Sequence, residues 1–243
     1  MEYMLAGSGF SSLCTVIGAF PALFFRNISY RGKDMLLAFT AGSMITASIY
    51  SLIPSALKIS NLFVITTGIL LGTMILTLIE LNLPELKPGN SLHPSLDAKS
   101  VMFLIAITLH NLPEGLSVGV SYASQYRELG PLVSIAFGLQ NMPEGFLIAL
   151  FLVTNRIDSL KAFFFTTVTA ALEFLFAVLG YLFTDKVKDL VPYGLSFAAG
   201  AMLYVVVEEI MPESYENGHE KLAAFSFIFG LLTMIIFTHL FEG

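Results

Sequence analysis

Eight apolar stretches of about 20 residues each follow one another along this chain of 243 residues and leave few choices of fold. A helix needs about 20 mostly apolar residues to cross the hydrocarbon core of a bilayer. Turn-forming residues stand in the short connections, and the alternation of a long β-barrel is absent. We therefore predict an all-α polytopic membrane protein with eight transmembrane helices. They cover approximately residues 3–25, 35–57, 61–81, 101–124, 131–154, 162–183, 191–212 and 222–241.

Composition excludes several other classes of protein. Only 12% of the residues are charged, against about 25% in an ordinary soluble domain. The short connections leave no room for a separate soluble domain, so residues 1–243 are expected to form a single transmembrane domain. The net charge of −6 and the lack of basic runs argue against a nucleic-acid partner. A single cysteine, Cys14, excludes an intrachain disulfide and a cysteine-based zinc cluster.

The distribution of positive residues predicts an orientation in the membrane. One set of alternate connections carries eight of the 12 Lys and Arg residues, and the opposite set carries four. Positive residues favour the cytoplasmic side, so both termini are expected outside the cell, in a multi-pass protein of the cytoplasmic membrane. The first set comprises Arg26, Arg31, Lys33, Lys87, Lys99, Arg156, Lys161 and Lys221, and the second comprises Lys58, Arg127, Lys186 and Lys188.

A short motif recurs in the second and seventh stretches. Ala41-Gly42-Ser43-Met44 is followed ten residues later by Pro54, and Ala199-Gly200-Ala201-Met202 is followed ten residues later by Pro212. Four helices, the third to the sixth, lie between these two, so they run in opposite directions through the membrane. This is typical of an inverted-topology repeat, a common construction of secondary transporters. We predict that helices 1–3 and 6–8 form such a repeat around helices 4 and 5.

Two neighbouring stretches carry the same polar block. The fourth reads His110-Asn111-Leu112-Pro113-Glu114-Gly115, and the fifth reads Gln140-Asn141-Met142-Pro143-Glu144-Gly145. Further carboxylates lie in the sixth stretch, at Glu173, and in the seventh, at Glu208 and Glu209. A charge at bilayer depth is costly and needs a partner, and the eight stretches contain no Lys or Arg. The partner must therefore be a proton, water or a bound metal ion.

The spacing favours a metal. His110 and Glu114 stand four residues apart, on one face of a helix, and Gln140 and Glu144 repeat this spacing. One imidazole with carboxylates and amides suits a borderline divalent ion such as zinc, iron(II), cobalt or manganese. A lone intramembrane His or Glu can also be satisfied by neighbouring helices. Two helices with the same five-position pattern make that explanation much weaker here.

The doubled block resembles the signature of the ZIP (Zrt-, Irt-like protein) family of metal transporters. The resemblance implies eight spans, both termini outside, and a two-metal site within spans four and five. The first metal would be held by His110, Glu114, Gln140 and Glu144, with Met44 as a thioether ligand, although Met44 alone reads as a core filler. The second would be held by Asn111, Glu114, Asn141, Glu144 and Glu173. Glu208 and Glu209 would be exit-side ligands.

The chain departs from the family's usual pattern at two ligand positions and in one loop. Many relatives have His in place of Gln140, and some have Asp in place of Asn141, so the neutral amides here are expected to bind metal more weakly. The loop between spans three and four carries only His93, where relatives often have a His-rich stretch. The resemblance also makes a homodimer plausible.

The resulting hypothesis is import of divalent metal ions, with zinc first and Fe(II), Mn, Co and Cd as further substrates. The metal is bound as substrate, so no cofactor is expected and the protein is not expected to be an enzyme. Ligands must lose protons to bind, so transport should fall in acid. Two alternatives remain open. One is an intramembrane metal-dependent hydrolase, and the other is a proton-coupled carrier of small organic ions.

Overall fold

The computed structural model describes residues 1–24, 29–82 and 98–242, and in this part of the chain every regular element is helical. The loop histidine His93 lies outside the described residues. Eight helical spans are long and apolar enough to cross a membrane, as predicted. They are Glu2–Leu23, Tyr30–Ile59, Leu62–Leu81, Phe103–Ala123, Leu129–Thr154, Ser159–Lys186, Lys188–Tyr215 and Glu220–Leu240.

Several spans consist of more than one helical element. The first comprises α1 (Glu2–Ala19) and the 3-10 helix η1 (Phe20–Leu23), and the second comprises α2 (Tyr30–Thr46), η2 (Ala47–Leu52) and α3 (Ile53–Ile59). Single helices form the next four, α4 (Leu62–Leu81), α5 (Ala98–Ala123), α6 (Leu129–Thr154) and α7 (Ser159–Lys186). The seventh contains η3 (Lys188–Leu190), α8 (Val191–Val205), η4 (Val206–Ile210) and α9 (Met211–Tyr215), and the last is α10 (Glu220–Glu242).

Polar side chains at the helix starts explain where several spans begin. Ser29 accepts a hydrogen bond from the backbone N–H of Gly32 at the start of α2, and Asn61 accepts one from Val64 at the start of α4. The cap at Ser29 places the start of α2 at Tyr30, earlier than the predicted residue 35. Arg31 and Lys33 therefore lie inside the second span. The helical spans also include Lys58, Lys161, Lys186, Lys188 and Lys221 near their ends, which corrects the expectation that the spans contain no Lys or Arg.

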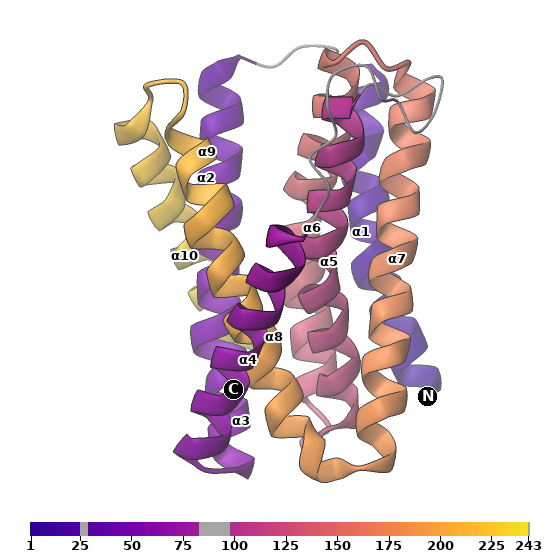
Figure 1. The fold of residues 1–243 in the computed structure, drawn as a ribbon, viewed down its shortest axis with the longest axis vertical. Coiled ribbons are helices and arrows are strands. Elements are labelled where there is room, and N and C mark those ends of the chain that lie inside the picture. Colours follow the sequence, from indigo (N-terminus) through magenta and orange to yellow (C-terminus); the bar gives the residue numbers. More distant parts are fainter. Residues whose placement is uncertain (25–28, 83–97, 243) are drawn as a thin grey trace.

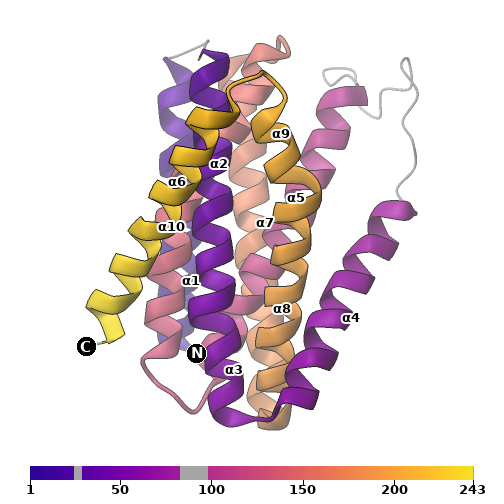
Figure 2. The same cartoon turned by 90° about the vertical axis from the view of Figure 1, so that its left-hand side faces the viewer.

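The spans form two groups that pack against each other. Figure 1 shows α1, α5, α6 and α7 together on the right, and α2, α4, α8 and α10 on the left. The closest pairings within the groups are α5 with α7, α1 with α6, α2 with α10, and α4 with α8, whereas α5 and α8 provide a large contact between the groups. Figures 1 and 2 place the start of α1 and the end of α10 in the lower half of the bundle.

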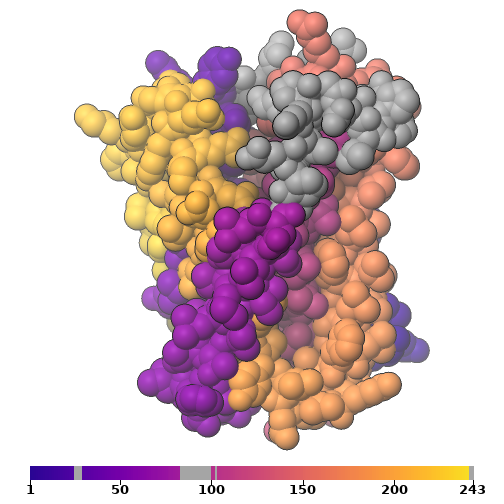
Figure 3. Space-filling view, viewed as in Figure 1, coloured from indigo at the N-terminus to yellow at the C-terminus, as the bar shows by residue number. Residues whose placement is uncertain are grey.

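Several helices present apolar side chains to the outside of the bundle, and α4 and α10 are examples. Figure 3 shows α4 on the surface of the molecule, and Leu70, Met74 and Leu78 of this helix are exposed. Phe225 and Phe229 of α10 are exposed in the same way. Such faces are expected where a helix meets lipid or another apolar surface.

The two copies of the Ala-Gly-x-Met motif have similar local structures. Each is followed by a π-helical turn, Ala47–Leu52 in the second span and Val206–Ile210 in the seventh. Pro54 and Pro212 then stand at equivalent places just beyond these turns. Proline cannot donate the backbone hydrogen bond of a regular helix, and a wider turn before it accommodates the lost bond. The inverted repeat remains a prediction, which this likeness supports.

Candidate metal centre

The doubled block is buried at the contact between α5 and α6. The side chains of His110 and Glu114 on α5 and of Gln140 and Glu144 on α6 are all inaccessible or nearly so. Gln140 Nε2 donates a hydrogen bond to Glu114 Oε1, which joins the two helices directly at this depth. Pro113 and Pro143 lie inside helices that continue through them. The structure thus buries all four residues predicted to hold the first metal and joins two of them, Gln140 and Glu114, by a hydrogen bond.

Several oxygen atoms at this contact are buried and have no hydrogen-bond donor among the described residues. All are acceptors, and buried acceptors are normally paired with a donor or a cation. Both oxygens of Glu144 belong to this set, so the carboxylate is free to bind a positive ligand. The set is Glu114 Oε2, Gln140 Oε1, Asn141 Oδ1, Glu144 Oε1 and Glu144 Oε2.

Glu173 lies in a second polar cluster, between α1, α6 and α7. Its Oε1 accepts hydrogen bonds from the hydroxyl of Ser11 at 2.8 Å and from Nδ2 of Asn141 at 2.9 Å. The hydroxyl of Thr15 lies 3.3 Å from Oε2. Glu173 and Asn141, both predicted ligands of the second metal, are therefore in contact. Asn111 donates a hydrogen bond to the backbone carbonyl of Thr169 at 3.3 Å instead.

The contribution of α1 to this cluster was not predicted from the sequence. Ser8, Ser11 and Thr15 are three and four residues apart, so they form a polar stripe on one face of an otherwise apolar helix. All three side chains are buried. The stripe could have been recognised in the sequence, because a helix face that contacts lipid would be apolar.

The imidazole of His110 contacts a carboxylate of the seventh span and not the other residues of the doubled block. Its Nε2 lies 2.7 Å from Oε2 of Glu209, in the π-helical turn η4. Glu80 of α4 lies beside Glu209 in turn, and Tyr204 donates a hydrogen bond to Glu80 at 2.7 Å. Glu80 was not identified from the sequence, although it is an acidic residue within two positions of the end of an apolar stretch.

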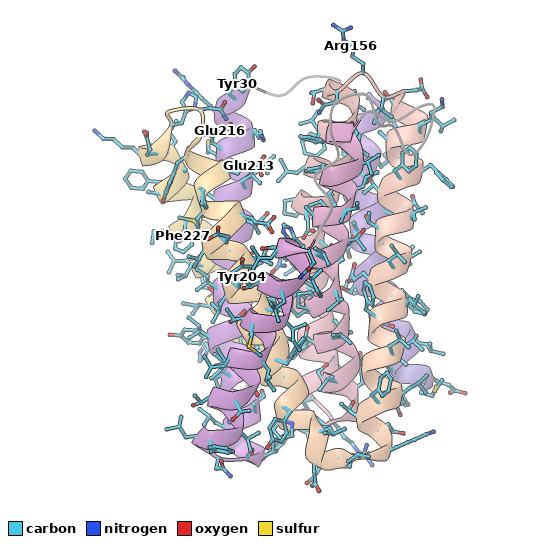
Figure 4. All side chains as sticks on the ribbon, viewed as in Figure 1. Tyr30, Arg156, Tyr204, Glu213, Glu216 and Phe227 are labelled. Carbon is cyan, nitrogen blue, oxygen red and sulfur yellow. The ribbon has the colours of Figure 1, made fainter. Side chains whose placement is uncertain are left out.

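A cavity of about 740 Å³ connects this centre to one end of the bundle. Met44, His110, Glu144 and Glu209 line it. It is also lined by residues at helix ends, including Tyr30 at the start of α2 and Asn155 just after α6. Figure 4 shows Tyr30 at the end of the bundle that also carries Arg156, opposite the end where α1 begins. The cavity thus reaches the side away from the termini.

The two adjacent glutamates of the seventh span have different environments. Glu209 lines the cavity, whereas Glu208 is exposed and does not line it. Within the described residues, no three His, Cys, Asp or Glu side chains are arranged to hold one metal ion. A metal centre here therefore needs the amide oxygens of Gln140 and Asn141, or a movement of His110 away from Glu209.

Several known proteins are similar to this chain in sequence. Residues 87–238 match the family model described as ZIP zinc transporter. The zinc transporter GufA of Myxococcus xanthus is 32% identical, and the match covers 96% of each chain. The zinc transporter ZIPB of Bordetella bronchiseptica is 31% identical over 96% of this chain and 79% of its own length. Human zinc transporter ZIP11 is 35% identical over 55% of this chain and 41% of its own length.

The family match includes α5 and α6, and therefore the doubled block and both of its glutamates. The matches to GufA and ZIPB extend over nearly the whole chain, in keeping with its eight apolar spans. With this signature and these relatives, the chain belongs to the ZIP family of zinc transporters, which makes it a multi-pass membrane transporter of metal ions and not an enzyme.

Proposed function

We propose that this protein carries divalent transition-metal ions into the cytoplasm, with zinc as the principal substrate and Fe(II), Mn, Co and Cd as further candidates. One observation carries the proposal. Both oxygens of Glu144 are buried acceptors without a donor among the described residues, and Glu144 lines a cavity that leads to one side of the bundle. Carboxylate and amide oxygens with one imidazole suit a borderline divalent ion.

The proposed centre has two adjacent positions for the ion. His110, Glu114, Gln140 and Glu144 would form the first, with Met44 on the cavity wall. The second would use Asn111, Asn141 and Glu173 together with the same two glutamates. Two ions that share bridging carboxylates repel each other, which assists release. Glu209 is the proposed ligand on the exit path because it lines the cavity, and the exposed Glu208 has a lesser part.

The proposed orientation in the membrane rests on the distribution of charge. The connections rich in Lys and Arg lie at the end that the cavity reaches, and positive residues favour the cytoplasm. We therefore propose that the structure represents an inward-facing state in the cytoplasmic membrane, with both termini outside. The inverted repeat of helices 1–3 and 6–8 and a homodimer remain part of the proposal.

Uptake of metal into proteoliposomes tests the function. Wild-type protein is compared with Glu144→Gln, which keeps the size of the side chain but removes its charge, across Zn, Cd, Fe(II), Mn and Co. We expect zinc uptake by the wild type and uptake slower by at least about a hundredfold in Glu144→Gln, because the charge that stabilises the bound ion is lost. A hundredfold change corresponds to about 2.7 kcal/mol. Glu216→Gln is the control, because Glu216 is exposed and lies outside the cavity lining.

The outcomes separate transport from its alternatives. Tight metal binding without uptake by the wild type would contradict the proposed transport by this chain. Uptake of an organic ion that persists in strong chelator would favour a proton-coupled carrier. Equal loss of uptake in Glu144→Gln and Glu216→Gln would remove the assignment of Glu144 as a ligand.

A further inference from the structure

A positive side chain lines the cavity through which cations are proposed to pass. Lys33 of α2 contacts Glu213 of α9, with 2.8 Å between Nζ and Oε1. Both residues line the cavity, together with Tyr30 at the same end. Among the described residues, Lys33 is the one Lys or Arg in the lining. A lone lysine on a cation path calls for an explanation, because its charge repels the substrate.

The position of the pair places it between the metal centre and the open end. Glu209 and Glu213 are four residues apart and line the same cavity, and Glu209 contacts His110 of the centre. Figure 4 shows Glu213 toward the end of the bundle that carries Tyr30 and Arg156. An ion that moves from Glu209 to the end of the cavity therefore passes the Lys33–Glu213 pair.

We propose that the ammonium group of Lys33 competes with a departing metal ion for the carboxylate of Glu213. This competition sets how long the ion stays at the mouth of the cavity. This inference rests on the proposed function. The Glu213 carboxylate attracts the ion from Glu209, and the ammonium group of Lys33 then displaces the ion from Glu213. The paired state has no net charge, so it neither retains a cation nor repels one strongly.

The two partners therefore have opposite effects on cation binding at the mouth. Without Lys33, Glu213 is an uncompensated carboxylate that retains divalent ions. Without Glu213, Lys33 is an uncompensated ammonium that repels them. Side chains that are 27% and 37% exposed keep water nearby, which screens these effects and limits them to moderate changes. If the ion pair served only to join α2 to α9, loss of either partner would remove the same contact. The two variants would then change zinc binding at the mouth in the same direction.

Sided zinc transport tests the proposal in four proteins, namely wild type, Lys33→Met, Glu213→Gln and the double variant. Zinc is added on the side that the cavity reaches, and its effect on zinc transport from the opposite side is followed. The measured quantity is the added zinc concentration that halves this transport. A cysteine introduced at the exposed Arg156 reports the orientation of the protein in the vesicles. Arg31→Met and Glu216→Gln are the controls, because each removes one charge from an exposed residue nearby that does not line the cavity.

We expect Lys33→Met to lower the half-inhibiting zinc concentration about three- to tenfold, and Glu213→Gln to raise it by a similar factor. The double variant should return close to the wild-type value, because its mouth is again neutral. Shifts of both single variants in one direction, or shifts no larger than those of the controls, would overturn the proposal. Absence of zinc transport by the wild type would instead overturn the proposed function on which it rests.

Discussion

The imidazole Nε2 of His110 lies 2.7 Å from Oε2 of Glu209, so the one histidine of the doubled block contacts the seventh span. In this arrangement Glu209 would compete with a bound metal ion for the imidazole of His110. If Glu209 draws the imidazole of His110 away from the proposed metal centre, the centre loses a ligand, which favours release of the ion. The contact links the proposed binding centre to the proposed exit path through two residues 99 positions apart in the sequence.

We expect Glu209→Gln to lower the maximal rate of zinc uptake about tenfold and to lower KM as well, which is the pattern of tighter substrate binding with slower turnover. The charge that draws His110 away is lost, so the imidazole remains with the metal. Glu208→Gln is the matched control, since it removes the same charge from the exposed neighbour. A raised KM in Glu209→Gln, or an equal effect of Glu208→Gln, would contradict this role of Glu209.

The proposed second metal position predicts a change in the number of bound ions. Glu173 is buried and contacts Ser11, Thr15 and Asn141, and it takes no part in the Gln140–Glu114 hydrogen bond. Glu173→Gln should therefore reduce bound zinc from two ions per chain to one, measured by equilibrium dialysis of the purified protein. Ser8→Ala, on the same stripe of α1, should leave the number unchanged, because Ser8 donates to the backbone carbonyl of Met4. Two ions bound in Glu173→Gln would place the second position elsewhere.

A buried acid outside the metal centre predicts a stability effect. Asp34 is fully buried, and its two oxygens contact Nδ2 of Asn217 at 2.7 Å and Nδ1 of His219 at 2.8 Å. Asp34→Ala leaves both partners unpaired and frees the turn between α9 and α10, so we expect a loss of about 3 kcal/mol in the free energy of unfolding. Thermal unfolding in detergent measures this effect. Asp189→Asn, at an exposed carboxylate, should have none.

The sequence predicted the membrane architecture because hydropathy is a local property. Each span could be recognised from its own residues, and the doubled block could be read as one polar surface because α5 and α6 each present it with helical periodicity. The motif around Met44 and Met202 predicted an inverted repeat, and the two copies have similar local structures. The π-helical turns that follow these motifs were not predicted, although Pro54 and Pro212 mark their places.

The contacts that complete the centre could not be predicted in the same way. Ser11 contacts Glu173 across 162 residues, and Lys33 contacts Glu213 across 180. Such pairs depend on which helices become neighbours, and hydropathy carries no information on that choice. The start of α2 is a smaller example. The apolar pattern placed it near residue 35, whereas the hydrogen bond of the Ser29 cap extends the helix to Tyr30 and brings Lys33 into the span.

Close packing of α6 on α1 beside the metal centre gives a further prediction. A Cβ atom on Gly145 would lie 2.0 Å from the backbone carbonyl oxygen of Thr15, which is part of a helix and cannot move aside alone. Gly145→Ala should therefore lower stability by about 1–3 kcal/mol, although alanine normally favours a helix by about 1 kcal/mol over glycine. Gly9→Ala is the control, since its nearest contact would be an ordinary 3.9 Å to Phe174. Thermal unfolding of both variants should show a loss for Gly145→Ala and no loss for Gly9→Ala, and a stabilised Gly145→Ala would contradict the packing.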